Sequence, residues 1–248
     1  MNYKNTFATL LAIFITSMAV AQTGVPQIDP RIYEIAEAPS PERIEADIRK
    51  LAGFGTRNTL SDTISETRGI GAARRWIKSE FDKISAACGG CLEVSYQYAL
   101  AEGDERRRIK EDTWIVNIIA IQRGTVHPNR YVIMSGDIDS RASSSTDATT
   151  DAPGANDNAS GMAGAIEAAR VLTQYEFPSS IVYTGLSGEE QGLYGGRFMA
   201  EMAKEEGWDI VGILNNDMIG NIEGINGVID NTTFRVFSEP TPATETEQ

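Results

Sequence analysis

The sequence predicts an α/β protein built on a mainly parallel, twisted sheet with helices on both faces. Between residues 130 and 216, segments typical of strands alternate with segments typical of helices. This order produces parallel strands joined by right-handed crossovers. The strand segments are apolar and rich in β-branched residues, as expected of buried strands. Acidic residues follow the ends of these segments, at the edge where open parallel sheets bind ligands.

The amino-terminal residues predict a signal peptide over residues 1–21, followed by a polar arm over residues 22–39. Lys4 supplies a positive charge, residues 7–20 are apolar with small side chains, and an A-x-A cleavage motif ends at Ala21. The apolar run is short for a membrane span, and an uncleaved anchor is the alternative. We therefore expect a secreted or periplasmic protein with no membrane span after signal cleavage.

A single domain is expected over residues 40–239, and it opens with two helices. The first begins at Ser40, a good N-cap followed by proline, and ends at a glycine. The second covers residues 70–87, where apolar residues recur at helical spacing. Residues 55–69, between these helices, are polar and are expected to form a loop.

The rest of the domain is expected to contain five strands and two helices. The strands cover residues 92–100, 113–121, 130–135, 180–186 and 210–216, and the helices cover residues 159–172 and 190–206. Residues 124–129 are expected to form a turn that contains His127, the only histidine. Residues 137–158 are expected to form a long polar loop, and loops of this length are usually functional or disordered. The tail over residues 240–248 is expected to be disordered.

Two cysteines, Cys88 and Cys91, form a Cys-Gly-Gly-Cys motif at the end of the second predicted helix. A redox motif of this type usually opens a helix, whereas here the glycines close one. Export would also place both thiols in an oxidising compartment. The sequence therefore favours a structural disulfide over a redox site, and over zinc binding because no second cysteine or histidine pair is present.

Composition and charge limit the class of partner. The chain has 248 residues, of which 41% are hydrophobic and 23% charged, and this is typical of one globular domain. Its formal net charge is -13, so its surface repels phosphate backbones. We expect no nucleic-acid partner, and the sequence makes no prediction of oligomeric state.

Acidic residues follow three of the predicted strands and precede one predicted helix. They are Asp137, Asp139, Asp157, Glu189, Glu190 and Asp217. Taken singly, each has a simpler explanation as a helix cap, a first-turn residue or a turn former. Taken together at one sheet edge, six carboxylates would repel one another, and divalent cations would relieve that repulsion. The joint pattern therefore favours a metal site.

Four segments that contain these acids resemble the ordered motifs of M28 metallopeptidases, a family of zinc aminopeptidase-like enzymes. The segments are SGDIDS at 135–140, PGANDNASG at 153–161, GEEQG at 188–192 and NDM at 216–218. They occur in the family's order with appropriate gaps, and they lie within residues 131–219. The resemblance implies a zinc-dependent exopeptidase (phosphorylase/hydrolase-like) fold.

The resemblance also implies two divalent metal ions, with zinc as the first choice. It implies that Asp157 bridges the two ions, that Glu190 binds one of them and Asp217 the other, and that Asp137 occupies a further ligand position. The family usually has a histidine at the position of Asp137. A carboxylate there would give the metal site of Asp137, Asp157 and Asp217 only hard oxygen ligands. Manganese, magnesium or calcium therefore become alternatives to zinc.

The catalytic roles follow from the same resemblance. Glu189 is expected to act as the general base on a metal-activated water, and Asp139 to orient the ligand at the first motif. The family tends to have a cis peptide after the bridging acid, here Asp157–Asn158. Its second histidine ligand lies well beyond the position of Asp217, where this chain has none. We therefore expect a chain that is C-terminally incomplete.

The function predicted is that of a secreted metal-dependent aminopeptidase, which hydrolyses N-terminal residues from peptides through a metal-activated water. Its partners would be peptide substrates with a free N-terminus. One alternative is a catalytically impaired or inactive M28-like binding or scaffold module, favoured by the missing histidines. Another is a glutaminyl-cyclase-like acyltransferase. The intact Gly188-Glu189-Glu190 favours the enzyme, because a scaffold needs no base beside a ligand.

Overall fold

The computed structural model describes residues 29–238. The predicted signal peptide and the predicted tail over 240–248 lie outside the described residues. The chain divides into an amino-terminal unit that ends at Ala38 and a main unit that begins at Pro39. The first unit contains helix α2 (Pro30–Glu37), whose N-cap Asp29 accepts a hydrogen bond from the backbone N–H of Arg31 at 3.0 Å. The predicted arm over residues 22–39 thus includes a helix.

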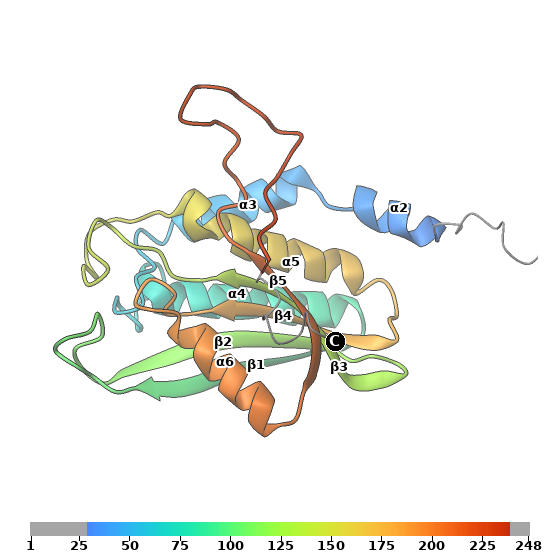
Figure 1. The fold of residues 1–248 in the computed structure, drawn as a ribbon, viewed down its shortest axis with the longest axis horizontal. Helices are drawn as coiled ribbons and strands as arrows, with labels where there is room; N and C mark the ends of the chain where they lie inside the picture. Colours follow the sequence, from blue (N-terminus) through green and yellow to red (C-terminus); the bar gives the residue numbers. More distant parts are fainter. Residues whose placement is uncertain (1–28, 239–248) are drawn as a thin grey trace, which may run out of the picture. The chain divides into compact units, whose positions relative to one another are not determined.

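The main unit is built on one five-stranded mixed sheet (Figure 1). Its strands are β1 (Leu92–Ala101), β2 (Thr113–Gln122), β3 (His127–Asp137), β4 (Ser179–Leu186) and β5 (Asp209–Asn216). The spatial order is β1-β2-β4-β3-β5. The pairs β3–β4 and β3–β5 are parallel, as the strand–helix alternation predicts, whereas β1–β2 and β2–β4 are antiparallel.

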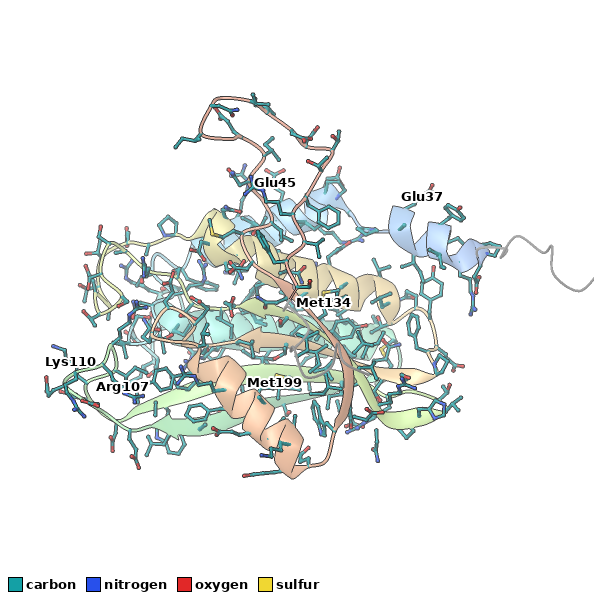
Figure 2. The ribbon with its side chains drawn as sticks, in the orientation of Figure 1. Glu37, Glu45, Arg107, Lys110, Met134 and Met199 are labelled. Carbon is teal, nitrogen blue, oxygen red and sulfur yellow. A yellow bond between two sulfur atoms is a disulfide. The ribbon has the colours of Figure 1, made fainter. Side chains whose placement is uncertain are left out.

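Helices cover both faces of the sheet, which confirms the predicted α/β class (Figure 1). Their bounds are α3 (Pro41–Ala52), α4 (Gly69–Ala87), α5 (Gly161–Leu172) and α6 (Tyr194–Glu205). Alternate residues of the central strands face opposite layers. Ile118 and Tyr183 pack in the core shared with α3, α4 and α5. Ile119 and Val182 pack in a second core with Met199 of α6, which is labelled in Figure 2.

Several predicted boundaries need correction. β3 begins at His127, which therefore belongs to a strand rather than to the predicted turn. The helix predicted from residue 190 begins at Tyr194, because residues 187–193 form a turn. The end of the long polar loop and the first two residues of the helix predicted from 159 form the segment η1 (Ala155–Ser160), whose backbone is not helical at Asp157 and Asn158. Residues 55–69 do form a loop, but its polar side chains at positions 56–59 are buried.

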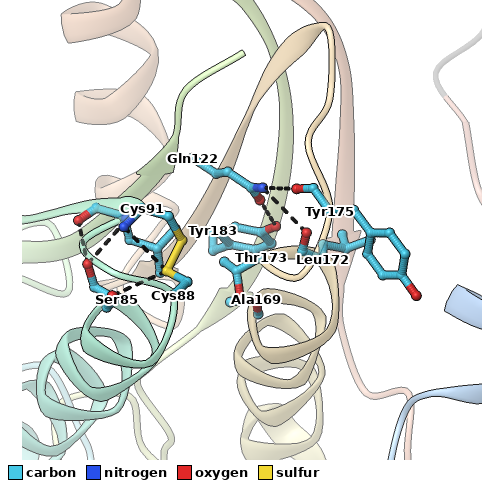
Figure 3. Close-up of a disulfide and its surroundings, with 10 residues drawn as sticks. Ser85, Cys88, Cys91, Gln122, Ala169, Leu172, Thr173, Tyr175 and Tyr183 are labelled. Atoms are coloured by element: carbon cyan, nitrogen blue, oxygen red, sulfur yellow. Dashed lines mark hydrogen bonds between the residues drawn. A yellow bond between two sulfur atoms is a disulfide. The ribbon is translucent and has the colours of Figure 1, made fainter. Parts of the chain in front are cut away.

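The predicted disulfide between Cys88 and Cys91 is confirmed, with 5.6 Å between the two Cα atoms (Figure 3). It joins the end of α4 to the start of β1. Beside it, the Ser85 hydroxyl donates to the backbone carbonyl of Leu92 at 2.9 Å. In the described part of the chain, no helix is long and apolar enough to cross a membrane.

Candidate metal centre

The strand register brings the sequence-predicted acids to one edge of the sheet. Asp137, the last residue of β3, lies opposite Leu186, the last residue of β4. On the other side of β3, Gly136 lies opposite Asn216, the last residue of β5. Because β3, β4 and β5 are parallel, the residues that follow β4 and β5 emerge beside Asp137. These residues include Glu189, Glu190 and Asp217.

The segment η1 adds Asp157 to this edge. The Asp157–Asn158 peptide is cis, as the resemblance implied. Asp157 and Asp217 are exposed, whereas Asp137 and Glu190 are buried. Two of the four predicted ligands are therefore buried, and the other two lie at the protein surface.

Asn158, which is not among the predicted site residues, joins these segments. Its side-chain amide nitrogen donates to Oδ2 of Asp137 at 3.1 Å and to the backbone carbonyl of Asn216 at 2.8 Å. Its side-chain oxygen accepts from the backbone N–H groups of Gly161 at 3.1 Å and Met218 at 3.3 Å. Asn158 thus links the ends of β3 and β5 to the start of α5. The sequence feature that could have indicated this role is the position of Asn158 directly after Asp157 in the second motif.

Asp139 holds the turn that carries the two glutamates. Its carboxylate is almost completely buried and accepts from the backbone N–H of Glu189 at 3.2 Å and of Glu190 at 3.0 Å. Both bonds are charge-assisted and therefore stronger than ordinary amide bonds. Asp139 thus positions Glu189 and Glu190 with respect to the end of β3.

Burial and mutual repulsion raise the pKa values of four acids at this edge. Burial, followed by the charges of Asp139, Glu189 and Asp217, raises the pKa of Asp137 to about 8. Burial, followed by the charges of neighbouring acids, raises the pKa of Glu189 to about 7. Burial also raises the pKa values of Glu190 and Asp217, and the charge of Asp157 adds to both shifts. The carboxylates are therefore close enough to feel one another electrostatically.

Two arginines lie at this edge, and each has a different role. Arg141 pairs through Nη1 with Oε2 of Glu190 at 3.3 Å. Arg57 is fully buried and donates to the backbone carbonyls of Ile138 at 2.8 Å, Pro153 at 2.6 Å and Gly154 at 3.0 Å. It therefore ties the end of β3 to the loop before Asp157, and no local sequence pattern indicated this.

The described residues do not form a metal site as they stand. Across residues 29–238, no group of three or more histidine, cysteine, aspartate or glutamate side chains is placed to hold a metal ion. His127 is at the opposite end of β3 from Asp137, and both cysteines are bonded to each other. The acids share one edge, and carboxylate oxygens are suitable ligands for a hard divalent cation. Their arrangement in this structure, however, does not surround an ion. The individual ligand assignments therefore stay predictions.

Comparison with known sequences points to one family. Residues 117–237 match the model of peptidase family M28. A probable zinc metalloprotease of Pyricularia oryzae is 43% identical over 84% of this chain and 41% of its own length. A probable zinc metalloprotease of Pyrenophora teres f. teres is 41% identical over 90% of this chain and 46% of its own length. The chain thus spans about half the length of the curated relatives it matches.

Solved structures share the fold at low sequence identity. The Legionella pneumophila LapA aminopeptidase matches with a TM-score of 0.60 and 18% identity, covering 80% of this chain and 47% of that one. A Porphyromonas gingivalis glutaminyl cyclase matches with a TM-score of 0.58 and 19% identity, covering 74% and 62%. These two similarities show the fold alone. The sequence match and the acids at the sheet edge agree with each other, and through residues 117–237 this chain belongs to peptidase family M28.

Proposed function

We propose that this chain is part of a zinc-dependent peptidase that removes N-terminal residues from peptides. The observation that carries the proposal is the convergence of Asp137, Glu189, Glu190 and Asp217 on one edge of the parallel strands, where each has a raised pKa. Groups with strongly shifted pKa values collect at functional sites. The names of the fungal relatives support zinc and proteolysis.

Glu189 is the residue that we propose as general base. It lies half-buried on the turn after β4, held there by the bond from its backbone N–H to Asp139. A carboxylate with a pKa of about 7 accepts a proton well near neutral pH and can release it again. Glu189 would remove a proton from the water that attacks the peptide carbonyl.

Asp137, Asp157, Glu190 and Asp217 are the residues that we propose as metal ligands. Each would supply carboxylate oxygen, and a bound zinc ion would contribute acidification of water and polarisation of the carbonyl. Glu190 is engaged by Arg141 in this structure, so a cation would compete with that arginine. The free α-amino group of a substrate would be attracted by acids of the same edge, which supports exopeptidase action.

A non-catalytic binding module is the second candidate. It is favoured by the absence, over residues 29–238, of a pre-formed group of three metal ligands. Under this reading the chain would bind peptides without cleaving them. The chain would be exported in either case, and the disulfide between Cys88 and Cys91 supports export, because such bonds persist in oxidising compartments.

Metal titration and an activity assay distinguish the two candidates. Calorimetry with zinc and with manganese is run on this chain, on Asp137→Asn and on the exposed control Asp209→Asn. Hydrolysis of aminoacyl-nitroanilides is measured on the same proteins, on Glu189→Gln and on the Pyrenophora teres relative. We expect weak metal binding that is lost in Asp137→Asn only, and slow hydrolysis that is lost in Glu189→Gln. A relative that cleaves the substrates, with no metal binding and no cleavage by this chain, would support the binding module instead.

A further inference from the structure

A cavity of about 1020 Å³ opens beside the candidate centre. Its wall is formed by the loop before α4, by α4, by β1 and β2, by the loop that connects these two strands and by Thr146. Lys110 lies on that loop, as Figure 2 shows. None of the six predicted site acids lines this cavity, so its chemistry is a separate question.

The cavity carries positive charge in an acidic protein. Four basic side chains line it, namely Arg74, Arg75, Arg108 and Lys110, and two acidic ones do so, namely Glu111 and Asp112. The local balance is therefore +2, whereas the chain as a whole has a net charge of -13. A positive cavity on an acidic molecule would concentrate anionic groups.

Arg74 is the most unusual of these residues. Only 6% of it is exposed, and its Nη2 atom has no hydrogen-bond partner among the described residues. Its Nε donates to the Ser187 hydroxyl at a long 3.3 Å. Within residues 29–238, no carboxylate lies within 4 Å of Arg74, Arg108 or Lys110. A buried, unpaired guanidinium is costly, and an anionic ligand would offset part of that cost.

Exposed aromatic side chains stand on the same wall. Tyr98 on β1 is 60% exposed and Trp114 on β2 is 58% exposed. Tyr96 lies next to Tyr98 in an edge-to-face arrangement, with 5.8 Å between ring centroids. Arginine and large aromatic side chains together are typical of surfaces that bind peptides and proteins.

The cavity adjoins the turn that carries Glu189. Arg108 donates from Nη1 to the backbone carbonyl of Glu190 at 2.6 Å, and Arg74 reaches the Ser187 hydroxyl on the other side of that turn. A peptide bound with one end at the carboxylate edge could therefore extend into the cavity.

We propose that this cavity binds a carboxylate of the peptide substrate through Arg74, Arg108 and Lys110, with the peptide chain packed over Tyr98 and Trp114. This inference rests on the proposed function for its ligand class, a peptide. The carboxylate can come from an acidic side chain or from the C-terminus of a short peptide. The competing explanation is that Arg74 only balances the buried charge of Asp139, which acts on it at longer range.

The test is peptide binding without turnover, in the presence of a chelator. The probes are Leu-Gly-Glu-amide, Leu-Gly-Gln with a free C-terminus and Leu-Gly-Gln-amide, and the readout is the dissociation constant from calorimetry. We expect at least one carboxylate peptide to bind roughly fivefold more tightly than the neutral amide. The arm that binds more tightly identifies the side chain or the C-terminus as the source.

The variants are Lys110→Gln and Arg74→Met, with Lys204→Gln on α6 as the matched control. Lys110 is exposed, so Lys110→Gln should fold normally even if Arg74→Met does not. We expect both pocket variants to reduce the preference for the carboxylate and the control to retain it. Equal binding of all three probes to the unaltered chain, or a preference unchanged in Lys110→Gln, overturns the proposal. Zinc-dependent hydrolysis with no such preference would retain the proposed function and remove only this inference.

Discussion

At the scale of single residues, the edge of the sheet depends on buried side chains that hold other segments in place. Asn158, Asp139 and Arg57 are each buried, and each bonds segments that are far apart in the chain. Together they determine where the acids of the proposed centre lie. Their replacement should affect stability and the geometry of the edge together.

Asn158→Ala is expected to lower the free energy of unfolding by about 2 kcal/mol. The change leaves the buried Oδ2 of Asp137 and the backbone N–H of Gly161 without the partners they have here. Urea denaturation measures the effect, and the exposed Asn129→Ala serves as the control. A loss in Asn158→Ala no larger than that in the control would contradict the linking role of Asn158.

In protein from which metal ions have been removed by a chelator, Asp137 should make the fold less stable as the pH rises. Its pKa is raised from 3.8 to about 8 in the folded state, so between these values the folded chain binds more protons than the unfolded chain. The free energy of unfolding should therefore fall from about pH 4 to about pH 8, by at most about 1.4 kcal/mol per pH unit for this group.

Asp137→Asn should reduce the decrease in the free energy of unfolding with pH. Part of the decrease should remain, because the pKa of Glu189 is also raised. Denaturation at several pH values measures the slope, with the exposed Asp209→Asn as control. Parallel pH curves for Asp137→Asn and the unaltered chain would show that Asp137 titrates normally.

At the scale of elements, a buried ion cluster joins the three helices on one face of the sheet. Arg170 of α5 contacts Asp47 of α3 at 2.5 Å, Glu80 of α4 at 3.1 Å and Glu167 of its own helix at 3.3 Å. Arg43 adds a further bond from α3 to Glu167. Three acids, one from each of these helices, thus converge on one arginine.

Arg170→Met is expected to destabilise the protein by about 3–5 kcal/mol. The substitution retains much of the side-chain volume but leaves Asp47 and Glu167 buried next to each other without their shared cation. The control is Arg49→Met, because Arg49 forms an exposed pair with Glu45, and such pairs contribute under about 1 kcal/mol. Equal effects of the two substitutions, measured by chemical denaturation, would contradict this account.

At the scale of the whole molecule, the sheet ends at β5 in an edge strand with exposed apolar side chains. β5 pairs only with β3 among the described strands, so its outer edge has free backbone groups. Its apolar side chains are exposed, with Val211 at 46%, Ile213 at 59% and Leu214 at 57%. An apolar edge strand of this kind is a template for association.

We therefore expect the isolated chain to self-associate at micromolar concentrations. The double substitution Ile213→Lys and Leu214→Lys should reduce association, because charges on an edge strand oppose strand pairing. Light scattering coupled to size-exclusion chromatography measures the mass, and Ile64→Lys, at an exposed loop position, is the control. A monomeric unaltered chain would show that the β5 edge is not an association surface.

Local patterns in the sequence predicted much of this fold. The apolar segments predicted at 180–186 and 210–216 match β4 and β5 within one residue. Ser40 caps α3 by accepting from the backbone N–H of Arg43, and the Cys-Gly-Gly-Cys motif forms the expected disulfide. Period, caps and turn residues act over a few neighbouring positions, so they can be recognised in one chain. The acids at the strand ends were found for the same reason, since the end of a strand is a local feature.

Long-range contacts decided the rest. The polar loop at 55–69 is buried because Arg57 meets carbonyl groups at positions 138, 153 and 154, which no pattern around Arg57 indicates. The antiparallel placement of β1 and β2, the pairing of Arg141 with Glu190 and the exposure of Asp157 and Asp217 also depend on which segments meet in space. The sequence alone thus specified the elements and the acids that end the strands. The tertiary structure decided which of those acids are buried, which are paired and how closely they approach, because burial and charge separation are properties of the packed chain.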